Sequence, residues 1–263
     1  MTETFLHKIF EVKKRRVEKQ KYLVDMIDLK ERAFLVRSSS SPHKLQKALE
    51  RPDKINIIAE IKRASPSKGI INDNIDVAAV AASYEKGGAC AVSVLTEEDF
   101  FKGSLDDLKR TRAAIDLPIL RKDFVFDEFQ IYESAEAGAD VILLIVAMLD
   151  DMNLEKLYHT AHVELGLDVL VEVHTLEELR RAEQLEANII GVNNRDLHSF
   201  NVSIDVSRDL IHYKPLHSLM ISESGITTKD EILELHKSGF NGFLIGETLM
   251  RSEDPASMLE FLQ

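Results

Sequence analysis

Residues 57–69 are the most informative part of the chain, and they read Ile57-Ile58-Ala59-Glu60-Ile61-Lys62-Arg63-Ala64-Ser65-Pro66-Ser67-Lys68-Gly69. The continuous apolar start is typical of a strand that is buried on both faces, as in a parallel sheet. Glu60 and Lys62 are two residues apart, so their side chains point to the same side of this strand. Burying a carboxylate and an ammonium group costs free energy unless they are paired or used. The stretch therefore predicts a strand that ends in a functional site.

Seven more segments with strand character follow this one, and helical segments lie between them. The strands that we expect are Ile55–Ile61, Ala91–Leu95, Pro118–Lys122, Asp140–Val146, Asp168–Val173, Asn188–Asn193, Leu219–Glu223 and Gly242–Ile245. The helices that we expect between them are Val77–Lys86, Leu105–Ala114, Glu128–Ala137, Leu154–Leu165, Leu176–Leu185 and Lys229–Lys237. Eight such units in series predict a parallel (β/α)8 TIM barrel. A doubly wound open sheet is the weaker alternative, because no Gly-x-Gly-x-x-Gly motif follows the first strand.

Residues 1–50 precede the first strand and predict an N-terminal helical extension. We expect one helix from roughly Thr4 to Leu29, because Phe10, Val17 and Val24 recur seven residues apart on one side. A chain of 263 residues has the usual length of one α/β barrel. Residues 1–263 are therefore expected to form a single domain that includes the extension.

The charge of the chain is uneven, with a net value of −12. Residues 1–51 carry 13 Lys and Arg against 7 Asp and Glu, whereas the remainder carries 20 against 38. The basic run Lys13-Lys14-Arg15-Arg16 has no nucleic-acid readout motif beside it, so we interpret it as a solvated helix face on an acidic body. The longest apolar run, Val141–Leu149, is too short to span a membrane. With one cysteine, Cys90, and no apolar leader, the chain is expected to be cytoplasmic.

Polar residues gather where the predicted strands end, which is where barrel enzymes carry their chemistry. The segments at these ends are Glu60 to Lys62, Thr96-Glu97-Glu98, Arg121-Lys122-Asp123, Glu172 to His174, Asn193-Asn194-Arg195-Asp196, Glu223-Ser224-Gly225 and Gly246-Glu247. The fourth strand stays apolar, so Leu143 is expected to line a hydrophobic wall. Two lysines and two glutamates in one barrel mouth shift each other's pKa values, which suits general acid–base catalysis.

The ends of the last two strands predict a phosphate site. Gly225 and Gly246 let backbone N–H groups approach an anion, and a short helix is expected to start near Thr248. Glu247 is expected to contribute only its backbone N–H, with its side chain turned away. The histidines, including His174, lack the spacing of metal ligands, so we expect neither a metal nor a cofactor.

These strand ends form an ordered set of motifs, namely Ala59-Glu60-Ile61-Lys62-Arg63-Ala64-Ser65-Pro66-Ser67, Leu95-Thr96-Glu97-Glu98, Leu120-Arg121-Lys122-Asp123-Phe124, Val171-Glu172-Val173, Gly191-Val192-Asn193-Asn194-Arg195-Asp196-Leu197, Glu223-Ser224-Gly225-Ile226 and Phe243-Leu244-Ile245-Gly246-Glu247. The set resembles the indole-3-glycerol-phosphate synthase family over nearly the whole chain, including the N-terminal extension. The resemblance implies a carboxy-lyase of tryptophan biosynthesis. Its substrate would be a small phosphosugar, 1-(2-carboxyphenylamino)-1-deoxyribulose 5-phosphate, which loses carbon dioxide and water as the indole ring closes.

The resemblance also implies roles for individual residues. Lys122 would be the general acid, with its pKa lowered toward the working pH, and Glu172 would serve the later dehydration. Lys62 would bind the substrate carboxylate, and Glu60 would pair with and orient both lysines. Asn193 would donate a hydrogen bond to the substrate, with Arg195 as its support. The carboxylate and phosphate ligands would be Ser65, Ser224, Gly225, Gly246 and Glu247. The wall around the aromatic ring would consist of Phe101, Phe124 and Leu143.

Two other classes of function remain open from the residues alone. One is another phosphosugar barrel enzyme, such as phosphoribosylanthranilate isomerase, which would not need two lysines beside a carboxylate site. The other is a non-catalytic phosphosugar-binding protein, which would need neither Lys122 nor Glu172. The loop from Ser65 to Gly69, followed by Asn72-Asp73-Asn74, is expected to act as a lid over the site.

Overall fold

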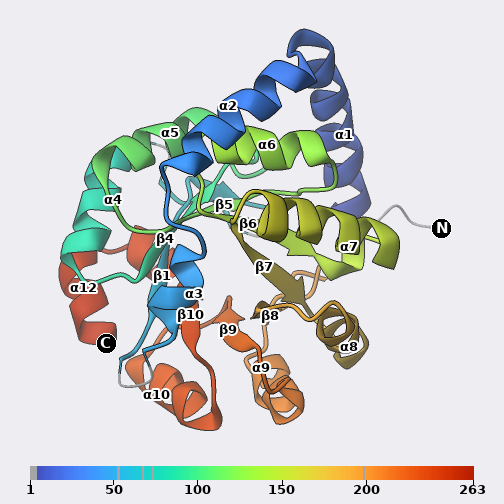
Figure 1. Cartoon of the computed structure of the whole chain (residues 1–263). Helices are drawn as coiled ribbons and strands as arrows, with labels where there is room; N and C mark the ends of the chain where they lie inside the picture. The colour runs from blue at the N-terminus through green and yellow to red at the C-terminus, as the bar shows by residue number, and fades with distance from the viewer. Residues whose placement is uncertain (1–4, 52–53, 67, 73, 198) are drawn as a thin grey trace.

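The computed structural model describes residues 5–51, 54–66, 68–72, 74–197 and 199–263, and it contains a closed barrel of parallel strands (Figure 1). The barrel strands are β1 (Ile57–Ile61), β4 (Ala91–Leu95), β5 (Ile119–Lys122), β6 (Val141–Ile145), β7 (Asp168–Val173), β8 (Ile189–Asn193), β9 (Leu219–Glu223) and β10 (Gly242–Ile245). They pair in chain order, and β10 closes the ring on β1, with Ile57 beside Phe243. The predicted (β/α)8 barrel is confirmed, and each of its eight predicted strands is present.

The helices between the strands form the outer layer of the barrel. They are α4 (Val77–Lys86), α5 (Leu105–Ala114), α6 (Glu128–Glu136), α7 (Asp151–His159), α8 (Leu176–Gln184), α9 (Asp205–Leu210), α10 (Lys229–Ser238), α11 (Glu247–Met250) and α12 (Pro255–Leu262). A π-helical turn (Thr160–Glu164) extends α7, and 3-10 turns occupy Val146–Met148 and Ile211–Tyr213. Helix α7 begins three residues before its predicted start, because the carboxylate of Asp150 accepts a hydrogen bond from the Asn153 N–H and caps it. No helix among these described residues is long and apolar enough to cross a membrane.

The N-terminal extension consists of three helices, α1 (Phe5–Leu23), α2 (Met26–Ser38) and α3 (Lys44–Leu49). The prediction of one helix to Leu29 is wrong, and its expected first residue, Thr4, lies outside the described residues. The chain turns at Asp25, whose carboxylate accepts hydrogen bonds from the N–H groups of Ile27 and Asp28 and starts a new helix. Helix α2 then runs alongside α6 (Figure 1).

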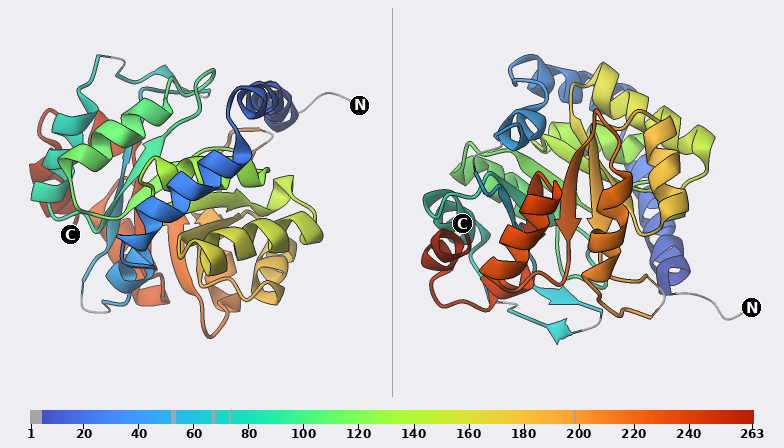
Figure 2. Two further views of the ribbon diagram at one scale, coloured as in Figure 1. Left: turned by 45° about the horizontal axis from the view of Figure 1, so that its top comes forward. Right: turned by 90° about the horizontal axis from the view of Figure 1, so that it is seen from below.

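The apolar core has an inner part, within the barrel, and an outer part, between the strands and the helices. Helix α3 closes the N-terminal end of the barrel, where Leu45 and Leu49 join inner residues such as Ile221. A two-stranded antiparallel hairpin, β2 (Ala64–Ser65) with β3 (Gly69–Ile70), follows β1 at the opposite end. Figure 2 shows this hairpin and the first turns of α1 at the same end of the barrel. Helix α3 thus fills the inner core at the N-terminal end, whereas the carboxyl ends of the strands border a cavity.

The hairpin occupies the segment that we expect to act as a lid. Its base is held by an ion pair between the Arg63 guanidinium and the Asp107 carboxylate, at 2.6 Å. Ser67 and Asp73, which belong to the expected lid, lie outside the described residues. The lid therefore stays a prediction.

Candidate active site

A cavity of about 1050 Å³ opens at the carboxyl ends of the barrel strands. It is lined by every residue that the sequence predicted for the site: Glu60, Lys62, Ser65, Phe101, Lys122, Phe124, Leu143, Glu172, Asn193, Arg195, Ser224, Gly225, Gly246 and Glu247. These residues come from strands and loops spread over most of the chain. The fold brings them together because all parallel strands of a barrel present their carboxyl ends on one face.

Lys122 lies between two carboxylates on the far side of the mouth. Its Nζ is 2.7 Å from Glu172 Oε2 and 2.6 Å from Glu223 Oε2. The ion pair of Glu60 is made with Lys62 instead, at 2.8 Å. The prediction that Glu60 pairs with both lysines is therefore wrong for Lys122. Strand order does not explain this choice, because one strand separates β5 from β1 and one separates it from β7, whereas β9 lies opposite.

The pKa of Lys122 is raised, which contradicts the lowering that we expected from the sequence. Burial by itself lowers this pKa, but the negative charges of Glu172, Glu223 and Glu60 outweigh the burial. Three glutamates are buried in the mouth, Glu60, Glu172 and Glu223, where we expected two. The additional charge keeps the ammonium group protonated.

Glu223 is the residue of this cluster that the sequence analysis did not choose. Burial, with the charges of Glu172 and Glu60, raises its pKa to about 7, although Lys122 acts in the opposite direction. Its Oε1 atom is buried and has no hydrogen-bond partner among the described residues. Gly191 makes room for it, since a Cβ atom there would lie 2.0 Å from this oxygen. Its place as the last residue of a strand, directly before Ser224-Gly225, was the signal that pointed to it.

Glu172 has the opposite electrostatic environment from Glu223. Burial raises its pKa, but Lys122, His174 and a hydrogen bond from Asn193 together lower it. The His174 ring lies between two carboxylates, with Nε2 3.5 Å from Glu172 Oε1 and Nδ1 3.2 Å from Glu178 Oε2. Two neighbouring carboxylates therefore differ in their affinity for a proton, as acid–base catalysis requires.

The turns after β9 and β10 leave little room for side chains. Gly225 has a positive φ of 78°, and a Cβ atom there would lie 2.4 Å from Val202 Cγ1. At Gly246 a Cβ atom would lie 2.4 Å from Glu60 Oε1. Helix α11 starts at Glu247, close to the predicted Thr248, and the Glu247 carboxylate is 3.1 Å from the Arg251 guanidinium. These turns border the cavity, and their glycines leave no room for a larger side chain there.

The opposite wall of the cavity is apolar. The rings of Phe101 and Phe124 have centroids 6.2 Å apart, and Leu143 lies beneath them among the buried residues of the inner core. Leu6 and Ile9 of α1 also line this cavity. Sequence analysis missed both, although their spacing of three residues places them on one face of the helix.

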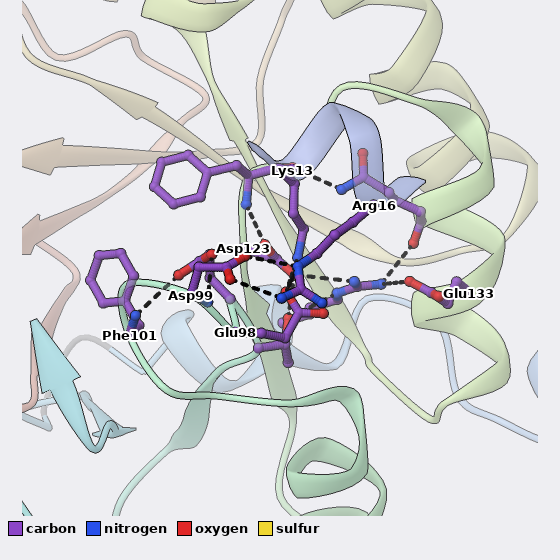
Figure 3. Close-up of polar contacts among 12 residues, drawn as sticks. Lys13, Arg16, Glu98, Asp99, Phe101, Asp123 and Glu133 are labelled. Carbon is purple, nitrogen blue, oxygen red and sulfur yellow. Dashed lines mark hydrogen bonds and ion pairs between the residues drawn. The ribbon is translucent and has the colours of Figure 1, made fainter. Parts of the chain in front are cut away.

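The basic run at residues 13–16 divides into two kinds of side chain. Lys14 and Arg15 are exposed, as we expected, but Lys13 is only 3% exposed. Figure 3 shows Lys13 and Arg16 facing Glu98, Asp99 and Asp123. The interpretation of a solvated face is therefore wrong for Lys13, whereas the expected acidic surface beneath the run is present.

One acidic cluster of the described residues, Glu97, Glu98 and Asp99, is compact enough to hold a cation. Its oxygens already have partners. Glu97 accepts hydrogen bonds from three backbone N–H groups of the following turn, and Glu98 and Asp99 form ion pairs with Lys13 and Arg16. The cluster is explained by these contacts.

The closed barrel, its polar mouth and its glycine-rich last turns define a (β/α)8-barrel enzyme. The fold resembles thiamine phosphate pyrophosphorylase from Pyrococcus furiosus, with a TM-score of 0.60 and 19% identity over 83% of this chain and 95% of that one. It also resembles N-acetylmannosamine-6-phosphate 2-epimerase from Clostridium perfringens, with a TM-score of 0.60 and 14% identity over 80% of this chain and 92% of that one. At these identities the likeness concerns the fold alone.

A family model described as indole-3-glycerol phosphate synthase matches residues 6–262. The chain is 44% identical over 262 residues to the indole-3-glycerol phosphate synthase of Carboxydothermus hydrogenoformans, covering 98% of this chain and 99% of the relative. It is 52% identical over 206 residues to that of Exiguobacterium sibiricum, covering 78% and 80%. The chain belongs to the indole-3-glycerol phosphate synthase family. The predicted family and its activity, a decarboxylating lyase of tryptophan biosynthesis, are confirmed.

Proposed function

We propose that the cavity residues close the indole ring of 1-(2-carboxyphenylamino)-1-deoxyribulose 5-phosphate, with the roles that the sequence predicted and one addition. The observation that carries the proposal is the Lys122 ammonium, held between Glu172 and Glu223 at 2.7 and 2.6 Å inside the cavity. A wall of Phe101, Phe124 and Leu143 on one side suits an aromatic ring. The glycine turns on the other side suit a phosphate.

In the first step, the ring carbon that bears the carboxylate attacks the ketone carbon of the sugar. A carbon–carbon bond forms, and the ketone oxygen becomes a hydroxyl group by taking a proton from Lys122. The ring is then cationic, so the bond to the carboxylate breaks, carbon dioxide leaves and the electron pair returns to the ring. No redox partner is needed for this balance.

In the second step, the hydroxyl group takes up a proton and leaves as water, and the methylene carbon bonded to nitrogen loses a proton. The carbon–carbon double bond that forms completes the aromatic indole. Glu172 serves this dehydration. Glu223 is the added residue: with a pKa of about 7 it exchanges a proton with Lys122, 2.6 Å away, and restores the acid for the next cycle. Glu223 and Glu172 thus divide the proton transfers, because Glu223 is readily protonated and Glu172 is not.

The other residues bind and orient the substrate. Lys62, held by Glu60, takes the substrate carboxylate together with Ser65. Asn193, which lines the cavity, donates a hydrogen bond to the substrate, and Arg195 supports the adjoining loop by donating to the Phe200 carbonyl. The phosphate is taken by Ser224 and the N–H groups of Gly225, Gly246 and Glu247, while the Glu247 side chain stays on Arg251.

We also propose that residues 1–263 act as one domain, in which the extension and the barrel share a core. Two observations support this. Arg37 of α2 is buried against Asp140 and the Leu165 carbonyl of the barrel, and Ile9 of α1 belongs to the inner core. Separating the extension would expose both.

The reaction can be followed by the fluorescence of its indole product, because the chain contains no tryptophan. We expect the fluorescence to rise when the substrate is added to the wild-type protein. Lys122→Met should lower kcat by about 10³-fold, since it removes the general acid, while the substrate analogue with its ketone reduced to an alcohol still binds. A Lys122→Met variant that retains turnover within about tenfold would overturn the assignment of the acid. The matched control is Lys21→Met, an ion-paired lysine on α1 outside the cavity.

A further inference from the structure

Lys13 of α1 is a buried lysine far from the barrel in sequence and close to the site in space. Its side chain is 4% exposed, and its Nζ is 3.0 Å from Glu98 Oε2 and 2.8 Å from Asp123 Oδ2 (Figure 3). These partners lie 85 and 110 residues away along the chain. A buried ammonium group is costly to keep unless its partners are well placed. The pairing therefore ties α1 to two separate segments of the barrel mouth.

The first of these segments is the end of β5, where Asp123 stands between Lys122 and Phe124. The carboxylate of Asp123 is buried and is held from four directions: Oδ2 accepts from Lys13, from the Thr96 hydroxyl at 2.6 Å and from Arg121 at 3.1 Å, and Oδ1 accepts from the Phe124 N–H at 2.8 Å. Both neighbours of Asp123 in the chain belong to the proposed machinery. A shift of Asp123 would move the proposed acid and one ring wall together.

The second segment is the turn after β4, which carries Phe101. Glu97 shapes this turn by accepting the N–H groups of Asp99, Phe100 and Phe101 at 2.7 to 3.0 Å. Glu98, at the start of the turn, is fastened to Lys13, and Asp99 is held by Arg16 at 2.8 Å. The Lys13 ammonium group thus connects the segments that carry Phe101 and Phe124, beside the hydrogen bond from the Thr96 hydroxyl to Asp123.

We propose that Lys13 is a positioning residue of the active site, which clasps the Phe101 turn to the segment 122–124 and thereby sets the width of the aromatic slot and the place of Lys122. The proposal rests on the proposed roles of Lys122, Phe101 and Phe124. The ring centroids of the two phenylalanines are 6.2 Å apart, so a displacement of about 1 Å changes how an aromatic ring fits between them. The N-terminal extension is then part of the catalytic apparatus as well as of the fold.

The competing explanation is that Lys13 only helps α1 to dock on the barrel. Helix α1 has apolar contacts for that purpose, such as Val17, which is 5% exposed and belongs to the outer core. Val17→Ala weakens docking without touching a polar contact of the mouth. Lys21→Met makes the same substitution as Lys13→Met on the same helix, at a lysine whose ion pair with Asp127, at 2.7 Å, lies outside the cavity.

The experiment compares Lys13→Met with these two controls, each in the full chain. Unfolding temperature, kcat and KM are measured, the last two by indole fluorescence at a temperature where all variants are folded. We expect Lys13→Met to lower kcat/KM at least about tenfold, with a raised KM, because the slot loses its geometry. We expect Val17→Ala and Lys21→Met to stay within about twofold of the wild type, even where Val17→Ala lowers the unfolding temperature as much.

Two results would overturn the proposal: an unchanged kcat/KM in Lys13→Met, or an equal loss in a Val17→Ala variant of matched stability. Should Lys13→Met not fold, Glu98→Gln cuts only the link to the turn at a side chain that is 37% exposed. We expect Glu98→Gln to raise KM by itself. An unchanged KM in this variant would also overturn the proposal. Failure of the proposed function is separate, since it would appear as no turnover in the wild type or full turnover in Lys122→Met.

Discussion

The two ends of the barrel both bury charged side chains, but they use them differently. At the N-terminal end, Asp140 is 2% exposed and meets Arg112 at 2.8 Å, Lys44 at 3.1 Å, Arg37 at 3.4 Å and the Ile119 N–H at 3.2 Å. At the carboxyl end, three glutamates share two lysines, and all five side chains line the cavity. Burial of charge is thus common to both. What distinguishes the functional end is that its charged groups line a cavity.

The N-terminal end also contains a buried carboxylate, Asp168, whose two oxygens differ in their hydrogen bonding. Its Oδ2 accepts hydrogen bonds from the N–H groups of Leu45 and Gln46, at the start of α3. Its Oδ1 lies 3.5 Å from His43 Nδ1. Both oxygens of Asp168 therefore lie against residues of the extension, so this carboxylate belongs to the interface on which α3 docks. The comparison predicts that mutations at this end change stability and that mutations at the mouth change turnover.

The largest effect that tests this comparison is expected for Asp140→Asn. Removing the negative charge leaves the cations of Arg112, Lys44 and Arg37 without their shared anion. The free energy of unfolding should therefore fall by about 3 kcal/mol. In the protein that remains folded, kcat/KM should stay within about twofold of the wild type, because Asp140 is remote from the cavity. Denaturant unfolding and the fluorescence assay measure the two quantities.

Asp151→Asn is the control for this variant. Asp151 pairs with Arg181 at 2.7 Å but is 79% exposed, so its loss should cost under about 1 kcal/mol. A tenfold loss of kcat/KM in folded Asp140→Asn would show that the two ends are not independent.

A smaller effect is expected for Glu223→Gln at the mouth. The variant keeps the shape of the side chain but cannot exchange a proton with Lys122, so kcat should fall about tenfold or more. Glu234→Gln is a suitable control, because Glu234 pairs with Arg208 at 2.7 Å on the surface, outside the cavity. An unchanged kcat in Glu223→Gln would remove Glu223 from the proposed machinery.

The same variant should change how stability depends on pH. The pKa of Glu223 is raised from 4.5 to about 7 in the folded protein, so the folded state binds the extra proton between these values. Its contribution to stability is therefore lost as the pH rises from 4.5 to 7. We expect the wild type to lose stability relative to Glu223→Gln across this window, and the difference to be constant above it. A wild type that gains stability relative to Glu223→Gln as the pH rises from 4.5 to 7 would contradict the raised pKa.

The smallest effect is expected for Glu247→Gln, at the rim of the mouth. Its carboxylate is already paired with Arg251, and only its backbone N–H is proposed to meet the phosphate. We expect kcat/KM within about twofold of the wild type. Gly246→Ala makes the contrasting change, since its Cβ would meet Glu60 Oε1 at 2.4 Å and disturb the Lys62 pair. A large loss in Glu247→Gln would mean that the carboxylate itself acts in the site.

The strands and the members of the site were predictable because both depend on local patterns. Strand Val141–Ile145 lies at the start of a continuous apolar run, which is the pattern of a strand buried on both faces of a parallel sheet. The break between α1 and α2 was missed because the seven-residue repeat reaches Val24 at the break, although Asp25 is a typical N-cap residue. Leu6 and Ile9 were missed as cavity residues, since a helical stripe does not say which surface will cover it.

The sequence by itself determined the barrel, the family and most of the residues proposed for the mouth, because strand periodicity and motif order are properties of neighbouring residues. Only the tertiary structure decided which charges pair there. Lys122 joins Glu172 and Glu223 rather than Glu60, and the pKa of Lys122 rises where we expected it to fall. It also decided that Lys13 is buried on Glu98 and Asp123. Electrostatic energies depend on distance and burial in space, and a linear pattern contains neither.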